Sequence, residues 1–355
     1  MLQPRSPHTA TSLFGNRKLT KLSFLTLYVV ALCCLAPLRS LWLDEVLQLS
    51  DTYHHDLYQT IDRVAHNPGG VPLTYIFQNL FVNTLDHPFY AARFLAILWA
   101  LAGMASLIWL VQLLETAWLP VAVAYALLPI SLRYALEVRQ YGPALAFSIC
   151  ATAVLVWLDH NPADFRAVIY GAVLALGLYS HPYLAFVIVA HMLWVIGRPS
   201  ATYVFSASAI AVLCFLPWYV FASGYWNEAV VKEGYQSAFT WKTPLMIPHE
   251  LSGGGYVLTC AVLALAVFGY RATAIPQSAK RLLLFCILVP LPLVMASNIM
   301  FRYFFAIRQL VYIVPPLCIF AVEGLRAIPK TPRTCLTVAL LGFALFSDFR
   351  LFHQA

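Results

Sequence analysis

Two adjacent carboxylates, Asp44 and Glu45, have the clearest chemical potential in this sequence. They directly follow the first long apolar run, in the motif Trp42-Leu43-Asp44-Glu45. A carboxylate held beside an acceptor hydroxyl can take its proton as a new bond forms, which is general-base catalysis. The structural alternative is a solvated loop start in which Trp42 anchors the chain at a membrane interface.

A third acidic candidate, Glu137, lies in the segment Glu137-Val138-Arg139-Gln140-Tyr141. We expect Glu137 to help hold a cation or an acceptor while Arg139 faces a phosphate, because a guanidinium stays charged and binds phosphate oxygens in pairs. The alternative is structural, since Arg133 and Glu137 have the i,i+4 spacing of an ion pair on one helix face.

Three more arginines, Arg93, Arg302 and Arg308, stand near the ends of apolar runs. Preorganised cations stabilise the negative charge that grows on a leaving phosphate. The alternative for each is an interfacial arginine that reaches to lipid headgroups.

A divalent metal is a further hypothesis, with Asp44, Glu137 and His181 as its candidate ligands. Neither HExxH nor a comparable ligand spacing supports it, so the sequence leaves the cofactor unknown. His181-Pro182 could simply close a helix hairpin, and His191 lies within an apolar run, where we expect an internally hydrogen-bonded histidine.

The composition indicates an integral membrane protein. Of 355 residues, 61% are apolar and 10% charged, whereas soluble domains are about 45–50% apolar and about 25% charged. The net charge of +7 does not form a basic stripe, which excludes nucleic acid as a partner. The eight cysteines lack CxxC spacing and fall in or beside apolar runs, which favours packing over zinc or redox chemistry.

Helices that cross a bilayer need about 20 residues. The predicted spans are 22–38, 89–114, 117–135, 141–158, 167–180, 183–197, 203–221, 256–270, 282–297, 309–326 and 334–350. Lys and Arg are denser in the short loops on the N-terminal side, which predicts a cytoplasmic N-terminus. Residues 1–21 are then a basic cytoplasmic tail and 22–351 one transmembrane domain, with outer loops at 39–88 and 222–255. The first loop is expected to carry short interfacial helices.

Taken in order, these motifs resemble a family, the membrane glycosyltransferases of the GT-C type, in the branch of protein mannosyltransferases and RgtA/ArnT-like sugar transferases. The matching segments are Leu41-Trp42-Leu43-Asp44-Glu45, residues 67–75, Ala92-Arg93-Phe94-Leu95-Ala96, residues 134–141, Tyr179-Ser180-His181-Pro182-Tyr183 and Arg308-Gln309-Leu310. The likeness covers about 40 to 325. Gly70-Val71-Pro72 lacks the family's double proline, and the chain is shorter than larger members.

The resemblance implies an all-α, GT-C-like bundle of about 10–11 transmembrane helices in the cell (inner or plasma) membrane, with its site on the extracytoplasmic face. It implies an inverting transfer of one sugar from a polyprenyl-phosphate donor to a glycolipid, polysaccharide or protein acceptor. Asp44 would be the base, supported by Glu45 and Glu137. Phosphate or substrate would bind at the residues Arg93, Arg139, Tyr141, His181, Arg302 and Arg308. Membrane lipid is the remaining partner.

Three other functions stay open at this point. A transporter or flippase tends to place its charged site at mid-membrane between repeated halves, whereas here the polar residues gather at one face. An O-antigen-type polymerase or ligase would move whole glycans, and a non-catalytic envelope subunit would need no site.

Overall fold

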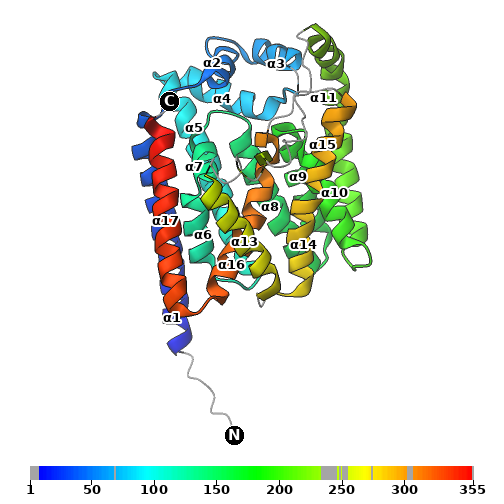
Figure 1. Cartoon of the computed structure of the whole chain (residues 1–355). Coiled ribbons are helices and arrows are strands. Elements are labelled where there is room, and N and C mark those ends of the chain that lie inside the picture. Colours follow the sequence, from blue (N-terminus) through cyan, green and yellow to red (C-terminus); the bar gives the residue numbers. More distant parts are fainter. Residues whose placement is uncertain are drawn as a thin grey trace.

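The computed structural model describes residues 8–67, 69–232, 246–247, 249, 255–272, 275–301 and 307–353, and these are helical without any strand. Most helices stand side by side in one bundle, and three short ones lie across one end of it (Figure 1). We call this the site end. The opposite end, where the N-terminal helix begins, is the tail end. The predicted all-α membrane bundle is confirmed.

The first outer loop forms a layer of short helices. After α1 (His8–Leu35) and the 3-10 turn η1 (Ala36–Leu38) come α2 (Leu43–Ser50), α3 (Leu57–His66) and α4 (Pro72–Thr84). Asp56 starts α3 by accepting the Gln59 backbone N–H at 2.8 Å, while the Gln59 side chain accepts the Asp56 N–H at 3.1 Å. Pro72 starts α4, in a position where a missing N–H is harmless. The short helices expected in 39–88 are therefore present.

The remaining helices build the bundle, and its polar turns lie between them. They are α5 (Pro88–Leu113), α6 (Trp118–Leu127), α7 (Pro129–Leu136), α8 (Tyr141–His160), α9 (Asp164–Ser180), α10 (Leu184–Val195), α11 (Ala201–Lys232), α13 (Tyr256–Ala272), α14 (Gln277–Leu288), α15 (Pro290–Phe301), η2 (Ile307–Ile313), α16 (Val314–Ala327) and α17 (Lys330–His353).

All eleven predicted apolar segments fall on helices, but fewer are long enough to cross a bilayer alone. Seven described helices pass by length and composition, or eight if α6 and α7, bent by 72°, are one span. α9 and α10 have 17 and 12 residues, about 26 and 18 Å at 1.5 Å per residue. They are separate helices, as the predicted break at His181-Pro182 requires. α11 continues to Lys232, so the first residues of the predicted outer segment 222–255 are helical.

Two glycines let α13 and α16 cross closely. A Cβ on Gly269 would collide with the Phe320 backbone, and one on Gly324 would collide with the Leu265 backbone. Small residues permit such close approach where lipid provides no hydrophobic force between helices. The α13–α16 pair thus fixes the helix that follows η2.

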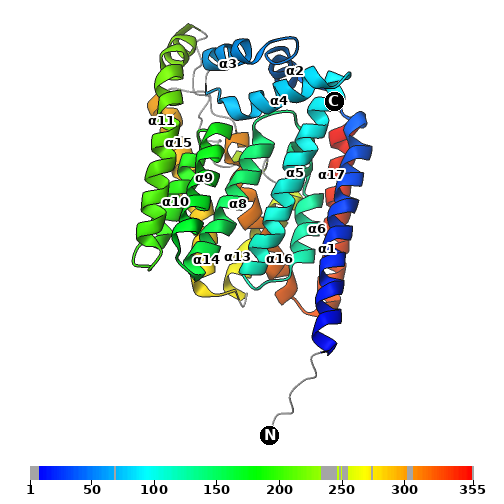
Figure 2. The same cartoon turned by 180° about the vertical axis from the view of Figure 1, so that it is seen from behind.

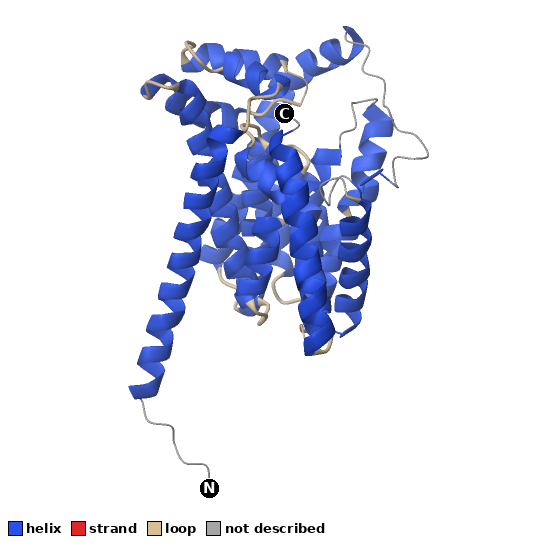
Figure 3. Cartoon of the chain, turned by 60° about the vertical axis from the view of Figure 1, so that its left-hand side comes forward, coloured by secondary structure: helices blue, strands red, loops and turns tan. Residues whose placement is uncertain are grey.

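The helices α1 and α17 stand at the edge of the bundle. Both appear at the same side in Figures 1 and 2, and Figure 3 separates them. Only 17% and 11% of their spanning residues are buried, against 78% for α8. The core that positions the site is therefore α5, α8 and their neighbours.

Candidate active site at one end of the bundle

Glu45 is the centre of a buried hydrogen-bond network. It lies in the first turn of α2 and is fully buried. Its Oε1 accepts from Arg93 Nη1 at 2.7 Å and from the Val138 backbone N–H at 2.7 Å, and its Oε2 accepts from the Trp42 N–H at 3.1 Å. This carboxylate therefore joins α2, α5 and the α7–α8 turn, and it is turned away from solvent.

Arg93 supplies the other half of this network from the first turns of α5. Besides Glu45, it donates to the backbone carbonyls of Leu136, Arg39 and Ser40. A guanidinium with this many acceptors, 1% exposed, has little capacity left for a ligand. The geometry favours a positioning role for Arg93 over the predicted phosphate contact.

Glu137 is buried between two guanidinium groups. Its Oε2 lies 3.6 Å from Arg39 Nη2 and 3.6 Å from Arg133 Nε. The i,i+4 ion pair between Arg133 and Glu137, considered above as a structural role for Glu137, is therefore formed. Neither carboxylate oxygen accepts a hydrogen bond from the described residues. Burial raises the pKa of Glu137 above its usual value, and the two arginines oppose that shift.

Asp44 differs from both glutamates because it is partly open to solvent. Its side chain is 25% exposed, and its Oδ2 accepts from Arg308 Nη2 at 3.0 Å. Arg139 Nη2 lies 3.9 Å from the same oxygen, and Arg139 Nη1 donates to the Asp44 backbone carbonyl at 3.0 Å. One reachable carboxylate and two arginines, 264 and 95 residues away in sequence, thus meet at one point.

Aromatic rings enclose Arg308. Its guanidinium carbon lies 5.1 Å from the centre of the Trp42 ring and 5.7 Å from that of Tyr141, within the range of cation–π attraction. The His181 ring is 5.6 Å from Tyr141. Burial, together with Arg139 and Arg308, lowers the pKa of His181 to about 3. The imidazole is therefore neutral at physiological pH, and its Nδ1 accepts the Tyr183 N–H at 3.2 Å.

The structure therefore brings together most of the predicted site residues. Arg139 and Arg308 contact Asp44, Tyr141 lies against Arg308, and His181 lies against Tyr141. Glu45, Glu137 and Arg93 are buried. Arg302 lies outside the described residues.

Two further residues of this region, Arg39 and Tyr75, were not among the predicted site residues. Arg39, which pairs with Glu137, also donates to the Arg133 carbonyl at 2.7 Å. The available signal was its position directly after an apolar span, where a charged residue needs a partner of opposite charge such as Glu137. Tyr75 is buried within the electrostatic influence of Arg139, and burial raises its pKa. Its place in a motif that resembles the family was the available signal.

Comparison with solved structures identifies the fold. Neither a family model nor a curated protein matches the sequence. ArnT from Cupriavidus metallidurans, in the apo state, aligns over 88% of this chain and 62% of its own, with 12% identity and a TM-score of 0.54. The Archaeoglobus fulgidus oligosaccharyltransferase AglB, solved with an inhibitory peptide and a dolichol-phosphate, aligns over 94% and 56%, with 12% identity and a TM-score of 0.54.

A structure described as the A. fulgidus oligosaccharyltransferase tethered with an acceptor peptide aligns over 81% of this chain and 47% of that chain, with 13% identity and a TM-score of 0.53. The chain has a GT-C-type fold. It spans between about half and three fifths of the length of these structures.

In this GT-C-type fold two of the three predicted metal ligands face guanidinium groups. Asp44 is bound by Arg308, Glu137 stands between Arg39 and Arg133, and His181 Nδ1 already accepts a backbone N–H. Within the described ranges, three or more His, Cys, Asp or Glu side chains nowhere gather as a metal-binding group. A divalent ion would have to compete with guanidinium groups for Asp44 and Glu137, so the arrangement fits an anionic ligand better than a metal.

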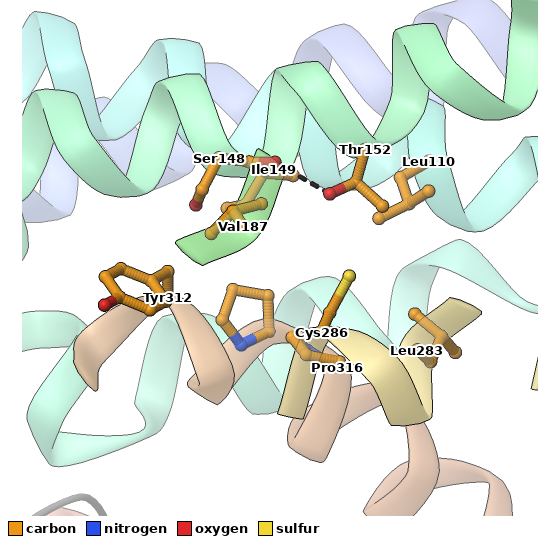
Figure 4. Close-up of a pocket in the computed structure, with 10 residues that line it drawn as sticks. Leu110, Ser148, Ile149, Thr152, Val187, Leu283, Cys286, Tyr312 and Pro316 are labelled. Atoms are coloured by element: carbon orange, nitrogen blue, oxygen red, sulfur yellow. Dashed lines mark hydrogen bonds between the residues drawn. The ribbon is translucent and has the colours of Figure 1, made fainter. Parts of the chain in front are cut away.

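A small cavity lies deeper in the GT-C-type bundle, between α8 and the α14–η2–α16 region (Figure 4). Its volume of about 20 Å³ is enough for one water and far too small for a sugar. Ser148, Thr152 and Tyr312 face it. Beside it, His191 bonds to Thr152 at 3.1 Å and to Tyr170 at 2.9 Å, which confirms the internally bonded histidine. This interior is too small for a substrate, and its hydrogen bonds join α8, α9 and α10.

Proposed function

We propose that this chain is a glycosyltransferase that moves one sugar from a polyprenyl-phosphate donor to an extracytoplasmic acceptor. The observation that carries the proposal is the contact of Asp44 with Arg308 and Arg139 at the site end. There, a carboxylate that can accept a proton lies beside two guanidinium groups that can bind a phosphate. The other two candidate carboxylates, Glu45 and Glu137, are buried in ion pairs and support this arrangement.

In the proposed reaction, an acceptor hydroxyl oxygen attacks the anomeric carbon as Asp44 takes its proton. The bond between that carbon and the phosphate oxygen breaks on the opposite face, which inverts the anomeric centre. The bonding electrons stay on the phosphate, which leaves as polyprenyl phosphate with one more negative charge. Arg308 and Arg139 stabilise this growing charge, the interaction that lowers the barrier most in such transfers.

Donor binding also releases the base. Without a donor, Arg308 is bonded to Asp44, and this pairing occupies both groups. A phosphate that enters the site competes with Asp44 for the guanidinium fork, since arginine binds phosphate oxygens in pairs. The exchange leaves the Asp44 carboxylate free to accept a proton only when the donor is in place.

The neighbours support the kind of substrate without fixing it. AglB has been solved with a dolichol-phosphate, and an oligosaccharyltransferase of the same organism with an acceptor peptide. A lipid-phosphate donor needs no nucleotide pocket, because its tail can lie among the spans. We place the site on the extracytoplasmic face of the inner or plasma membrane, from the predicted cytoplasmic N-terminus. The acceptor is a glycolipid, a polysaccharide or a protein.

Glycan analysis tests the proposal directly. Mass spectrometry of surface glycolipids, polysaccharides and proteins from cells with and without the gene should reveal the loss of one sugar residue from one acceptor class. Re-expression of the chain should restore it. An unchanged glycan profile, or the loss of whole glycan chains instead of one residue, would contradict single-sugar transfer and favour the polymerase alternative in the second case.

A further inference from the structure

The described part of the chain also has a well-defined hollow away from the site end. A cavity of about 370 Å³ lies between α6, α13, α16 and α17, a size typical of small-molecule sites. Its walls are aliphatic apart from Thr337, Arg326, Arg333 and Cys318. It exists because α17 stands away from the bundle, with 11% of its spanning residues buried.

One face of α17 forms the outer wall. The cavity is lined on this side by Arg333, Thr337, Leu340, Leu341 and Ala344, whose spacing places them on one face of the helix. From Arg333 to Ala344 the helix rises about 16 Å. This is close to half of the roughly 30 Å hydrocarbon core, the depth of one leaflet.

The charges of the cavity lie at one end only. Arg326 ends α16 and Arg333 starts α17, so both stand at the tail end (Figure 1). Glu323 neutralises Arg326 through a 2.5 Å contact. Arg333 donates to the Arg326 backbone carbonyl at 3.1 Å, and no carboxylate among the described residues pairs with it. A net positive charge therefore caps an apolar chamber.

This end is remote from the proposed transfer site. Arg308, which binds Asp44, begins the 20-residue span that ends beside Arg326. A span of that length is about 30 Å long. A donor phosphate at Asp44 is therefore on the other side of the membrane from Arg333.

We infer that this cavity binds an anionic phospholipid of the tail-end leaflet, with its phosphate at Arg333 and Arg326 and one acyl chain between α17 and α16. The fit rests on three matches: an apolar chamber, a depth of one leaflet and a cationic cap without a carboxylate on Arg333. The lipid fills the space that separates α17 from the bundle. This inference does not depend on the proposed transferase activity.

Lipid retention by the full chain tests the inference. The purified protein is equilibrated with mixed phosphatidylglycerol and phosphatidylcholine vesicles, extracted in mild detergent and analysed by native mass spectrometry. The unmodified chain should retain phosphatidylglycerol in preference to phosphatidylcholine. Arg333→Gln should weaken that retention about fivefold, the effect of one basic residue on an anionic lipid. Ala344→Phe, which fills the cavity, should remove it.

Arg281→Gln is the matched control, since Arg281 is an exposed arginine in the first turns of α14, outside the cavity lining. Thermal melts of all variants identify any that misfold, and Arg333→Gln changes only a partly exposed side chain. Equal retention of both phospholipids would overturn the inference, as would an equal effect of Arg281→Gln. Displacement of the phosphatidylglycerol by polyprenyl phosphate would also overturn it, because the cavity would then be a donor site.

Discussion

Replacing Asp44 with asparagine separates two effects that this side chain has in the proposed reaction. The amide keeps the size of the group but cannot take a proton, and general-base catalysis contributes about 10²- to 10⁴-fold. We therefore expect kcat to fall by roughly that factor. The protein should still fold and insert, because the buried network is built on Glu45 and not on Asp44.

The same change should strengthen donor binding. Arg308 and Asp44 touch at 3.0 Å with side chains 23% and 25% exposed. The attraction of such a pair is about 5–6 kcal/mol at an effective dielectric of about 20, before the opposing desolvation. A net of about 1–2 kcal/mol for this partly exposed pair corresponds to roughly tenfold tighter binding of a phosphate.

The assay is transfer from a polyprenyl-phosphate sugar by purified protein in detergent, with kcat and the donor KM measured separately. The control is Asp62→Asn, a half-exposed carboxylate of the same loop that lies 3.9 Å from His66 Nδ1 and far from the arginines around Asp44 in sequence. Undiminished kcat in Asp44→Asn would refute the base. A donor KM that rises severalfold would refute the competition between Asp44 and phosphate.

Four further outcomes are expected. Arg308→Gln should lower kcat by about 10²- to 10³-fold, as for the loss of one oxyanion donor, and Arg308→Lys should recover part of the activity. Equal activity of the unmodified chain and both variants would remove Arg308 from the mechanism. Burial raises the pKa of Glu137, so the native state binds the Glu137 proton more tightly than the unfolded state does, and stability should fall as pH rises from about 4.5. Thermal melts should therefore show the melting temperature of Glu137→Gln increasing relative to that of the unmodified chain as pH rises. Parallel curves for the two chains would contradict this. Arg93→Met should destabilise the fold by about 3–5 kcal/mol by leaving Glu45 unpaired, seen as a lower melting temperature, whereas a stable but inactive variant would indicate a direct catalytic role. Gly269→Ala should destabilise the α13–α16 crossing by about 1–3 kcal/mol, while Gly342→Ala, with open space around it, should not; equal melting temperatures would contradict the close crossing.

The membrane class and the ordered motifs could be predicted from the sequence, because both depend only on which residue types occur and in what order. Apolar runs mark helices, and the break at His181-Pro182 follows from proline chemistry. The meeting of Asp44, Arg139 and Arg308 was expected from their common face and from the family likeness. Contact distances were beyond reach, since they depend on how α2, the α7–α8 turn and η2 pack.

The division of labour among the acids was also not predictable from residue types. Glu45 and Asp44 are neighbours in sequence, yet one is buried and the other partly exposed, because a helix turns successive side chains to different sides. The ten or eleven predicted spans compare with seven or eight described helices that are long and apolar enough to cross a membrane alone. Hydropathy marks apolar helices, but short ones such as α10 are apolar through burial within the protein, without the length to cross lipid.

The Arg93 network has a consequence for how the protein is made. Its acceptors come from residues 39, 40 and 45, which leave the ribosome early, and from Leu136, which emerges about 40 residues after Arg93 itself. Until that stretch is translated, α5 carries a cation whose set of partners is incomplete. Nascent chains arrested before residue 136 should therefore present an accessible Arg93, and the first loop should become protease-resistant only once synthesis has passed the α7–α8 turn.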